Sequence, residues 1–233
     1  MKPASQRKPR STAVIEARNK AKRQGWLNWS RQGEGEEADE LAMLNGCFFD
    51  MSRAANVVDF FDKYGVLTEG AWAGQTFTLL DWQYNWLARG FGWVRRSESW
   101  KRVVRRFRYF YLEVPKKNGK TPLVATVGNY LLLADDPGSQ VNLLLAATTR
   151  KQAERCLLHA IRAYKFRPEM EMAVTTTRND GYYSVSAGDN NWTVLAADPE
   201  SADGINGHVL ADELHRWKGH EFFNTLRWSL ATQ

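Results

Sequence analysis

A strand-like segment, a short loop that ends in Gly-Lys-Thr and a helix-forming segment follow one another directly in the middle of the chain. Alternating aromatic side chains predict a strand over residues 107–113, and an apolar run predicts a helix over residues 121–134. Between them, the loop closes on Gly119, Lys120 and Thr121. This order places backbone N–H groups and a helix N-terminus around an anion, typically a phosphate. The feature therefore constrains the chain to an α/β fold with a phosphate-sized site beyond the end of a strand.

The residues of this loop suit separate roles in binding a nucleotide. Lys120 supplies a point charge for the β- and γ-phosphates, and the hydroxyl of Thr121 can ligate Mg²⁺. Asn118 and Gly119 contribute backbone N–H groups. Val114 occupies the position where the usual pattern has its first glycine. Because Gly-Lys-Thr also arises by chance, the loop alone leaves both a phosphate site and a fortuitous match open.

Two adjacent carboxylates further along the chain can supply the other half of such a site. A short apolar segment over residues 208–211 predicts a buried strand that ends at Asp212 and Glu213. Nucleotide hydrolases use one acid at this place to hold Mg²⁺ and the next to orient the attacking water. The alternative is that both acids cap a following helix. Because the loop and this strand end would share one edge of a parallel sheet, the two together favour the catalytic interpretation, with Asp212 on the metal side and Glu213 as the base.

The composition is that of an ordinary globular chain. A length of 233 residues with 43% hydrophobic and 25% charged side chains is enough for one substantial core with appendages. Cys47 and Cys156 lie far apart, which indicates a reducing compartment without a disulfide framework. We expect neither a membrane span nor a secretory signal, because no sufficiently long apolar run follows the basic N-terminus. His208 and His215 flank the acids, but without a nearby Cys or third His a zinc site is not expected.

The net charge of +6 is concentrated in two stretches. Residues 1–32 carry nine Lys or Arg against a single acid, Glu16. The second stretch, here called the basic cluster, consists of Arg95, Arg96, Lys101, Arg102, Arg105, Arg106 and Arg108. Such patches suit a polyanion, usually DNA or RNA. For the N-terminal stretch, a solvated tail without a partner is an equally open alternative.

Periodicity divides the chain into three parts. Residues 1–35 are expected to form a flexible basic tail, and residues 36–100 a small helical region with two short helices over 36–64 and an amphipathic helix over 79–94. From residue 101 to 233, strands and helices alternate, which predicts an α/β core of a mainly parallel sheet with helices on both faces. Beyond the elements already named, this core is expected to contain a strand over 141–147, a helix over 149–164, a β-hairpin over 181–197 and a closing helix over 219–230.

Four segments, in order and spacing, resemble the ATPase part of the large terminase subunits of tailed phages, the motors that pump DNA into procapsids. Residues 77–93 look like the adenine-reading segment of that family, and residues 115–121 are similar to its variant phosphate loop (Walker A), which often lacks the first glycine. Residues 146–153 resemble the segment after the next strand, and residues 204–215 the magnesium and catalytic-carboxylate motif (Walker B). The match covers roughly residues 60–233 and implies a P-loop NTPase fold.

The resemblance also implies roles for residues outside the two central motifs. Gln83 would recognise adenine, although a surface Gln on an aromatic helix is the alternative. Lys116 and Lys117 would add charge near the phosphates or solvate the loop, and we favour a phosphate contact for one of them. Arg150 is a candidate for an arginine finger supplied to a neighbouring subunit, against the simpler interpretation of an exposed Arg at a helix start.

The family likeness implies a magnesium-dependent ATPase that uses ATP and Mg²⁺, with Glu213 and Lys120 as the catalytic side chains. Its implied partners are double-stranded DNA, further copies of the chain in a ring on the portal of a procapsid, and the small terminase subunit. The expected location is the host cytoplasm during phage assembly, without a membrane. Because the sequence ends before the family's coupling motif and C-terminal nuclease domain, we do not expect nuclease activity from it.

Two other functions remain open at this level. A helicase-type translocase shares the phosphate loop, the acid pair and a base-reading Gln, but it would need a second motor domain. A non-catalytic nucleic-acid-binding remnant, acting through its basic tail, would bind nucleic acid without hydrolysing ATP.

Overall fold

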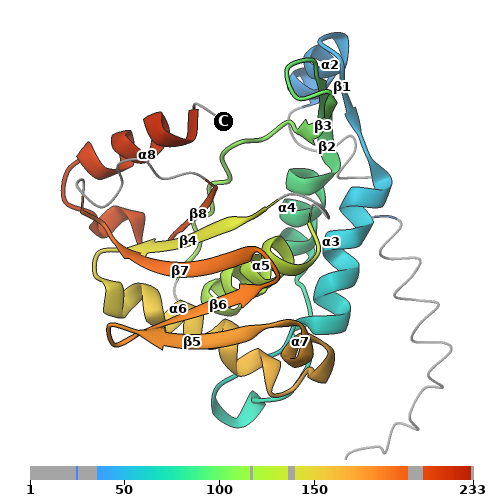
Figure 1. Cartoon of the computed structure of the whole chain (residues 1–233). Coiled ribbons are helices and arrows are strands. Elements are labelled where there is room, and N and C mark those ends of the chain that lie inside the picture. Colours follow the sequence, from blue (N-terminus) through green and yellow to red (C-terminus); the bar gives the residue numbers. More distant parts are fainter. Residues whose placement is uncertain (1–24, 26–35, 116–117, 136–139, 199–206, 232–233) are drawn as a thin grey trace, which may run out of the picture. The chain divides into compact units, whose positions relative to one another are not determined.

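A computed structural model describes residues 25, 36–115, 118–135, 140–198 and 207–231 (Figure 1). Most of the predicted basic tail, together with Lys116 and Lys117, lies outside these residues. The chain forms two compact units: the first comprises Met1–Val58 and Leu79–Tyr111, and the second Asp59–Thr78 and Leu112–Gln233. Within the described ranges, no helix has the length and apolar character needed to cross a bilayer.

The first unit contains a three-stranded antiparallel sheet of order β1-β2-β3. Its strands are β1 (Cys47–Phe49), β2 (Trp93–Ser97) and β3 (Arg102–Arg105). Its helices are α2 (Glu36–Leu44), the first part of α3 (Met51–Tyr64) and α4 (Asp81–Gly92). These helices confirm the prediction from apolar spacing, whereas the sheet was not predicted because its strands are short and β2 and β3 are rich in Arg.

A buried acid joins three elements of this unit. The carboxylate of Asp39 in α2 is 3% exposed and lies 2.6 Å from a guanidinium nitrogen of Arg89 in α4. Its other oxygen lies 2.6 Å from Arg106, which follows β3. The Arg106 guanidinium also lies over the rings of Trp93 and Phe107. Each charge of this Asp39 triad is therefore paired or stacked, as buried charges require.

No strand forms over residues 107–113, so that prediction was wrong. The alternation itself is real: the ring of Phe110 packs edge-on against Trp86, while Tyr109 and Tyr111 are 59% and 70% exposed. However, no backbone ladder pairs this segment with another strand in the described part of the chain. Alternation specifies which side chains are buried, but a strand also needs a neighbour to receive its hydrogen bonds.

The second unit contains a five-stranded sheet of order β5-β6-β7-β4-β8 (Figure 1). Its strands are β4 (Asn142–Ala147), β5 (Thr175–Asn179), β6 (Tyr182–Ala187), β7 (Asn190–Ala196) and β8 (His208–Ala211). β4 pairs in parallel with β7 and β8, whereas β5–β6 and β6–β7 are antiparallel. The expectation of a mainly parallel sheet is thus corrected to a mixed one, because tight turns join β5, β6 and β7 and such turns can only connect antiparallel strands.

Helices cover both faces of this sheet. Trp192 and Leu195 point to opposite faces, because side chains alternate along β7. The Trp192 indole meets Gly128 in the middle of α5 (Lys120–Leu133), where an added Cβ would lie 2.2 Å from a ring atom. Leu195 packs in a cluster with Phe222 of α8 (Glu221–Ala231). α5 and α8 therefore cover opposite faces, as the sequence predicted for its helices.

Most predicted elements of this unit are confirmed with boundaries shifted by one or two residues. The helix over 149–164 is α6 (Arg150–Tyr164), and the hairpin over 181–197 is formed by β6 and β7. Elements that were not predicted are β5, the short helix α7 (Pro168–Ala173) and the 3₁₀ turns η1 (Gly70–Trp72) and η3 (Leu214–Arg216).

Candidate nucleotide-binding site

The start of α5 is shaped by Gly119. This N-cap residue has φ 72° and ψ 20°, a left-handed conformation that glycine adopts without steric cost. Lys120 and Thr121 are then the first two helical residues, and their N–H groups have no acceptor within the helix. The side-chain amide of Asn118 donates to the carbonyl oxygen of Pro115 at 3.1 Å, which closes the preceding turn. The result is a helix N-terminus that can receive an anion.

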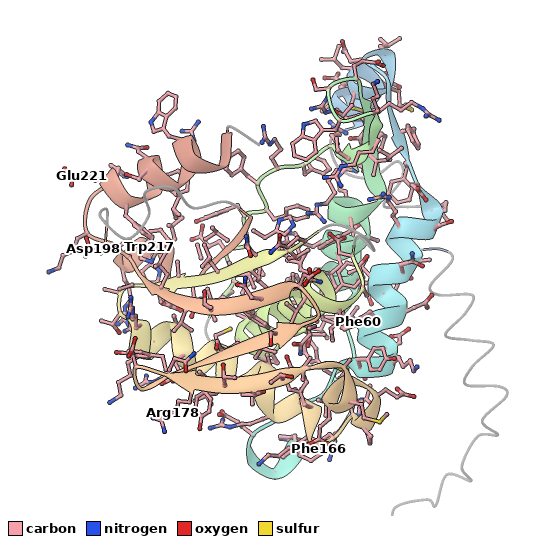
Figure 2. The ribbon with its side chains drawn as sticks, in the orientation of Figure 1. Phe60, Phe166, Arg178, Asp198, Trp217 and Glu221 are labelled. Atoms are coloured by element: carbon pink, nitrogen blue, oxygen red, sulfur yellow. The ribbon has the colours of Figure 1, made fainter. Side chains whose placement is uncertain are left out.

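The end of β8 is held in place from several sides. The Asp212 N–H donates to the carbonyl oxygen of Ala146 at 2.9 Å, which continues the pairing with β4 beyond the strand. At the other end of β8, Gly207 has φ 119°, and a Cβ there would lie 2.1 Å from the carbonyl oxygen of Asn142. Trp217, labelled in Figure 2, donates its indole N–H to the carbonyl oxygen of Asp212 at 3.2 Å. The backbone that carries the two acids is therefore fixed.

Sequence reasoning assigned no role to Gly207. The available signal was a glycine at the start of a buried strand, which marks a close approach of two backbones. It gives β8 its position beside β4, and through β8 it positions both acids.

The backbone of Glu213 is strained. Its φ of 51° and ψ of 43° lie in the left-handed region, which side chains other than Gly, Asn and Asp rarely adopt. Such conformations cost free energy and cluster at functional sites. Here Glu213 lies in the short connection between β8 and η3.

Lys120 lies between the two acids, as expected for a loop and a strand end at the same edge of the sheet. Its Nζ is 2.6 Å from Oε1 of Glu213 and 3.7 Å from Oδ1 of Asp212. All three side chains are partly exposed, at 30%, 21% and 32% for Lys120, Asp212 and Glu213. This Lys120 triad carries one positive and two negative charges, so a second cation is required to neutralise it.

The ion pair shifts the pKa of both partners. Hydrogen bonding from Lys120 lowers the pKa of Glu213 against a smaller opposing effect of burial. For Lys120, burial acts to lower the pKa, but the hydrogen bond to Glu213 and the charge of Asp212 outweigh it and the pKa is raised. Both groups are therefore charged at neutral pH, and Glu213 can accept a proton once Lys120 turns to another partner.

The donor set fits Mg²⁺ held mainly by phosphate and water. Mg²⁺ prefers oxygen ligands and uses one or two carboxylates rather than a complete protein cage. Among the described residues no group of three or more His, Cys, Asp or Glu could hold a metal ion alone. Such a shared site needs few oxygen ligands from the protein, and the Asp212 carboxylate and the Thr121 hydroxyl can supply them. The other oxygen of Glu213 lies 3.4 Å from His215, which is 72% exposed.

Gln83 and Arg150 have other contacts. Gln83 is 1% exposed, and its amide oxygen accepts the N–H of Leu80 at 2.8 Å, which caps the start of α4 in the first unit. Arg150, the first residue of α6, is exposed, and its guanidinium lies over the ring of Tyr182 at 5.6 Å. The structure therefore gives both residues structural contacts beside the roles predicted for them.

In this α/β domain, the helix N-terminus at Gly119, Lys120 and Thr121 lies beside two acids that follow β8. The family model for the large terminase subunit, ATPase domain, matches residues 81–233, and the chain belongs to this family. No match was found among curated proteins.

The fold is similar to that in the crystal structure of the HK97 bacteriophage large terminase. The two chains superpose with a TM-score of 0.60 and 17% sequence identity. The similarity covers 78% of this chain but 36% of the other, so the chain spans little more than a third of that terminase. At this identity the comparison shows a common fold.

Proposed function

We propose that this chain is the ATP-hydrolysing motor module of a terminase large subunit, and that it drives double-stranded DNA into procapsids. The observation that carries the proposal is the Lys120 triad in a member of this family, with Nζ 2.6 Å from Glu213 and 3.7 Å from Asp212. A helicase-type translocase or a non-catalytic remnant has no comparable support.

Nucleotide binding begins with an exchange of partners at Lys120. The γ-phosphate end of ATP takes the place of Glu213 beside the Lys120 ammonium, while the N–H groups of Lys120 and Thr121 receive phosphate oxygens. The Thr121 hydroxyl and the Asp212 carboxylate would hold Mg²⁺, which supplies positive charge against the phosphates. Release from Lys120 removes the main cause of the lowered pKa of Glu213, so ATP binding makes Glu213 a stronger base.

Hydrolysis then uses Glu213 as a proton acceptor. A water oxygen forms a bond to the γ-phosphorus, the bond from that phosphorus to the β–γ bridging oxygen breaks, and Glu213 accepts a proton from the water. Lys120 stabilises the negative charge on the transferring oxygens. The proposal assigns ATP hydrolysis, and not DNA cleavage, to these residues.

Further residues are proposed to complete the site. Adenine recognition by Gln83 stays a prediction, and its amide oxygen accepts the Leu80 N–H. Phosphate contact by Lys116 or Lys117 and a trans-acting role of Arg150 stay predictions.

DNA contact is proposed for the basic cluster of the first unit. Arg106 serves the Asp39 triad, and the Arg105 guanidinium lies over the Phe91 ring. In contrast, Arg95 and Arg96 on β2 and Lys101 in the β2–β3 turn are exposed, so their charges can contact phosphates. We further propose a ring of copies on a portal, a small terminase subunit as partner and the host cytoplasm as the location.

The test is phosphate release from ATP by the purified chain, with Mg²⁺ and with a chelator in excess. We expect magnesium-dependent hydrolysis, and in Glu213→Gln a rate lower by about 10²- to 10⁴-fold with nucleotide binding retained. A Glu213→Gln variant that hydrolyses ATP at the wild-type rate, or a wild type that binds ATP without hydrolysing it, would contradict the proposal.

A further inference from the structure

Two polar atoms at the carboxyl edge of the five-stranded sheet are buried without a hydrogen-bond partner among the described residues. They are Oγ1 of Thr148 and Oε1 of Gln152. Folded proteins satisfy nearly all buried polar atoms, because leaving one unpaired costs free energy. Two such atoms within one helical turn therefore need an explanation.

Strand register places Thr148 beside the acids. β4 and β8 run in parallel with Ala146 opposite Ala211, and the Asp212 N–H donates to the Ala146 carbonyl oxygen. Thr148 directly follows the end of β4, and Asp212 directly follows the end of β8. Thr148 and the two acids therefore emerge at the same edge of the sheet, from neighbouring strands.

Helix geometry places Gln152 toward the same site. Gln152 lies one turn before Cys156 in α6, and side chains four residues apart share a helix face. The Cys156 thiol donates to the carbonyl oxygen of Thr121 at 3.9 Å, so this face of α6 meets the start of α5.

The two oxygens match the requirements of a water rather than of a phosphate. A carboxamide oxygen only accepts, and it would repel a phosphate oxygen, whereas a threonine hydroxyl both accepts and donates. A water that attacks the γ-phosphorus has two O–H bonds. Glu213 accepts one, and the second needs a further acceptor if the oxygen lone pair is to face the phosphorus.

We propose that Thr148 and Gln152 are positioning residues of the ATPase site, which hold the water that Glu213 activates. This inference rests on the proposed function. It gives a role to two oxygens that have no partner among the described residues, and it adds Thr148 and Gln152 to the residues of the proposed site.

The experiment combines ATPase kinetics with thermal unfolding of the nucleotide-free protein, for the wild type and four variants. Thr148→Val removes the hydroxyl at constant volume, Gln152→Met removes the amide at similar length, and Thr148→Ser retains the hydroxyl. Thr149→Val is the matched control, because the Thr149 side chain already accepts the Gln152 N–H as an exposed helix cap. Its carbonyl oxygen continues to accept the same N–H.

We expect opposite signs for stability and activity. Thr148→Val and Gln152→Met should keep or raise the melting temperature and lower kcat by about tenfold with little change in KM, the effect of a hydrogen bond made in the transition state. Thr148→Ser should retain most of kcat. Thr149→Val should lower the melting temperature and leave kcat unchanged.

The outcomes separate this inference from the proposed function. If the wild type hydrolyses ATP and both Thr148→Val and Gln152→Met keep its kcat, the two oxygens are packing faults and the inference is wrong. If the wild type does not hydrolyse ATP, the proposed function itself fails. A loss of kcat in Thr148→Ser as large as in Thr148→Val would also overturn the role of the hydroxyl.

Discussion

The two units each contain a triad of charges, with inverse composition. In the first unit, Asp39 lies between Arg89 and Arg106, and its side chain is 3% exposed. In the second, Lys120 lies between Asp212 and Glu213, and its side chain is 30% exposed. The closest contact is 2.6 Å in both. Distance alone therefore does not distinguish an ion pair that stabilises the fold from one that we propose to be catalytic.

The two triads differ in how deeply they are buried and in how many further contacts hold each charged side chain in place. Arg106 has further bonds to the carbonyl oxygen of Ala38 and contacts with two rings, so its position is overdetermined. Lys120 has a flexible stem, and its two acidic partners are partly exposed. The Asp39 triad is suited to remain closed, and the Lys120 triad to open.

The largest expected effect comes from breaking the triad that should open. Lys120→Met should lower kcat for ATP by at least about 10²-fold, because the charge that stabilises the transferring phosphate is lost. The free energy of unfolding should change by no more than about 1 kcal/mol, since a solvent-accessible ion pair contributes little. Steady-state phosphate release and urea-induced unfolding measure the two quantities. A loss of stability that accounts for the loss of activity would remove the contrast between the triads.

The reverse pattern is expected for Asp39→Ala. Removal of the acid leaves two guanidinium groups without their buried counterion, which should lower the free energy of unfolding by about 3–5 kcal/mol. The ATPase rate per folded molecule should change little. Asp50→Ala is the matched control: Asp50 accepts the N–H groups of Ser52 and Arg53 at the start of α3, and loss of that cap should cost about 1 kcal/mol. Equal losses in the two variants would show that the Asp39 triad is not a stabilising centre.

A smaller effect is expected from substitutions that test whether the first unit binds DNA while the second hydrolyses ATP. Arg95→Glu combined with Arg96→Glu should weaken binding to double-stranded DNA about tenfold or more and reduce the salt dependence by about two phosphate contacts. Unstimulated ATP hydrolysis should be unaffected. Lys165→Glu, an exposed charge after α6, serves as the control. DNA affinity is measured by fluorescence anisotropy over a series of salt concentrations. Equal losses of affinity in both variants would show that the basic cluster contributes only through the overall positive charge of the chain.

The smallest effect is the pH dependence of the Lys120 triad. The folded pKa of Glu213 lies below its ordinary 4.5, so its stabilisation is present above about pH 4.5 and is lost as pH falls through the folded value. The pKa of Lys120 lies above 10.5, so its stabilisation is lost as pH rises through that folded value. The stability difference between wild type and Glu213→Gln should therefore form a plateau between these limits, of at most about 1 kcal/mol. A difference that grows on acidification would contradict the ion pair.

The parts of the site that could be predicted from sequence depend on local chain order. The Gly119-Lys120 step predicts that a helix begins at this point of the chain. The strand over 208–211 predicts that the two acids lie at its carboxyl end. Both therefore meet at one edge once the sheet forms. The left-handed turn at Glu213 and the close approach at Gly207 have no periodic signal, because they are set by the neighbouring strand.

The errors concern which strands pair. The segment around Phe110 has the side-chain alternation of a strand, but it belongs to neither sheet in the described part of the chain. In contrast, β2 and β3 carry four arginines and still pair, because the hairpin between them is short and β1 lies on the other edge. Strand pairing depends on two segments, so the side-chain pattern of one segment alone does not predict it.

Gly128 lets α5 pack closely against the Trp192 indole. The helix carries Lys120 at one end and, two turns later, rests its bare backbone on the Trp192 indole. One extra methyl group at residue 128 would lie 2.2 Å from a ring atom of Trp192, so the helix or the indole would have to shift. A shift of the helix would also move Lys120 at its first turn. The position of the ammonium relative to the two acids would then change, although no charged group had been replaced.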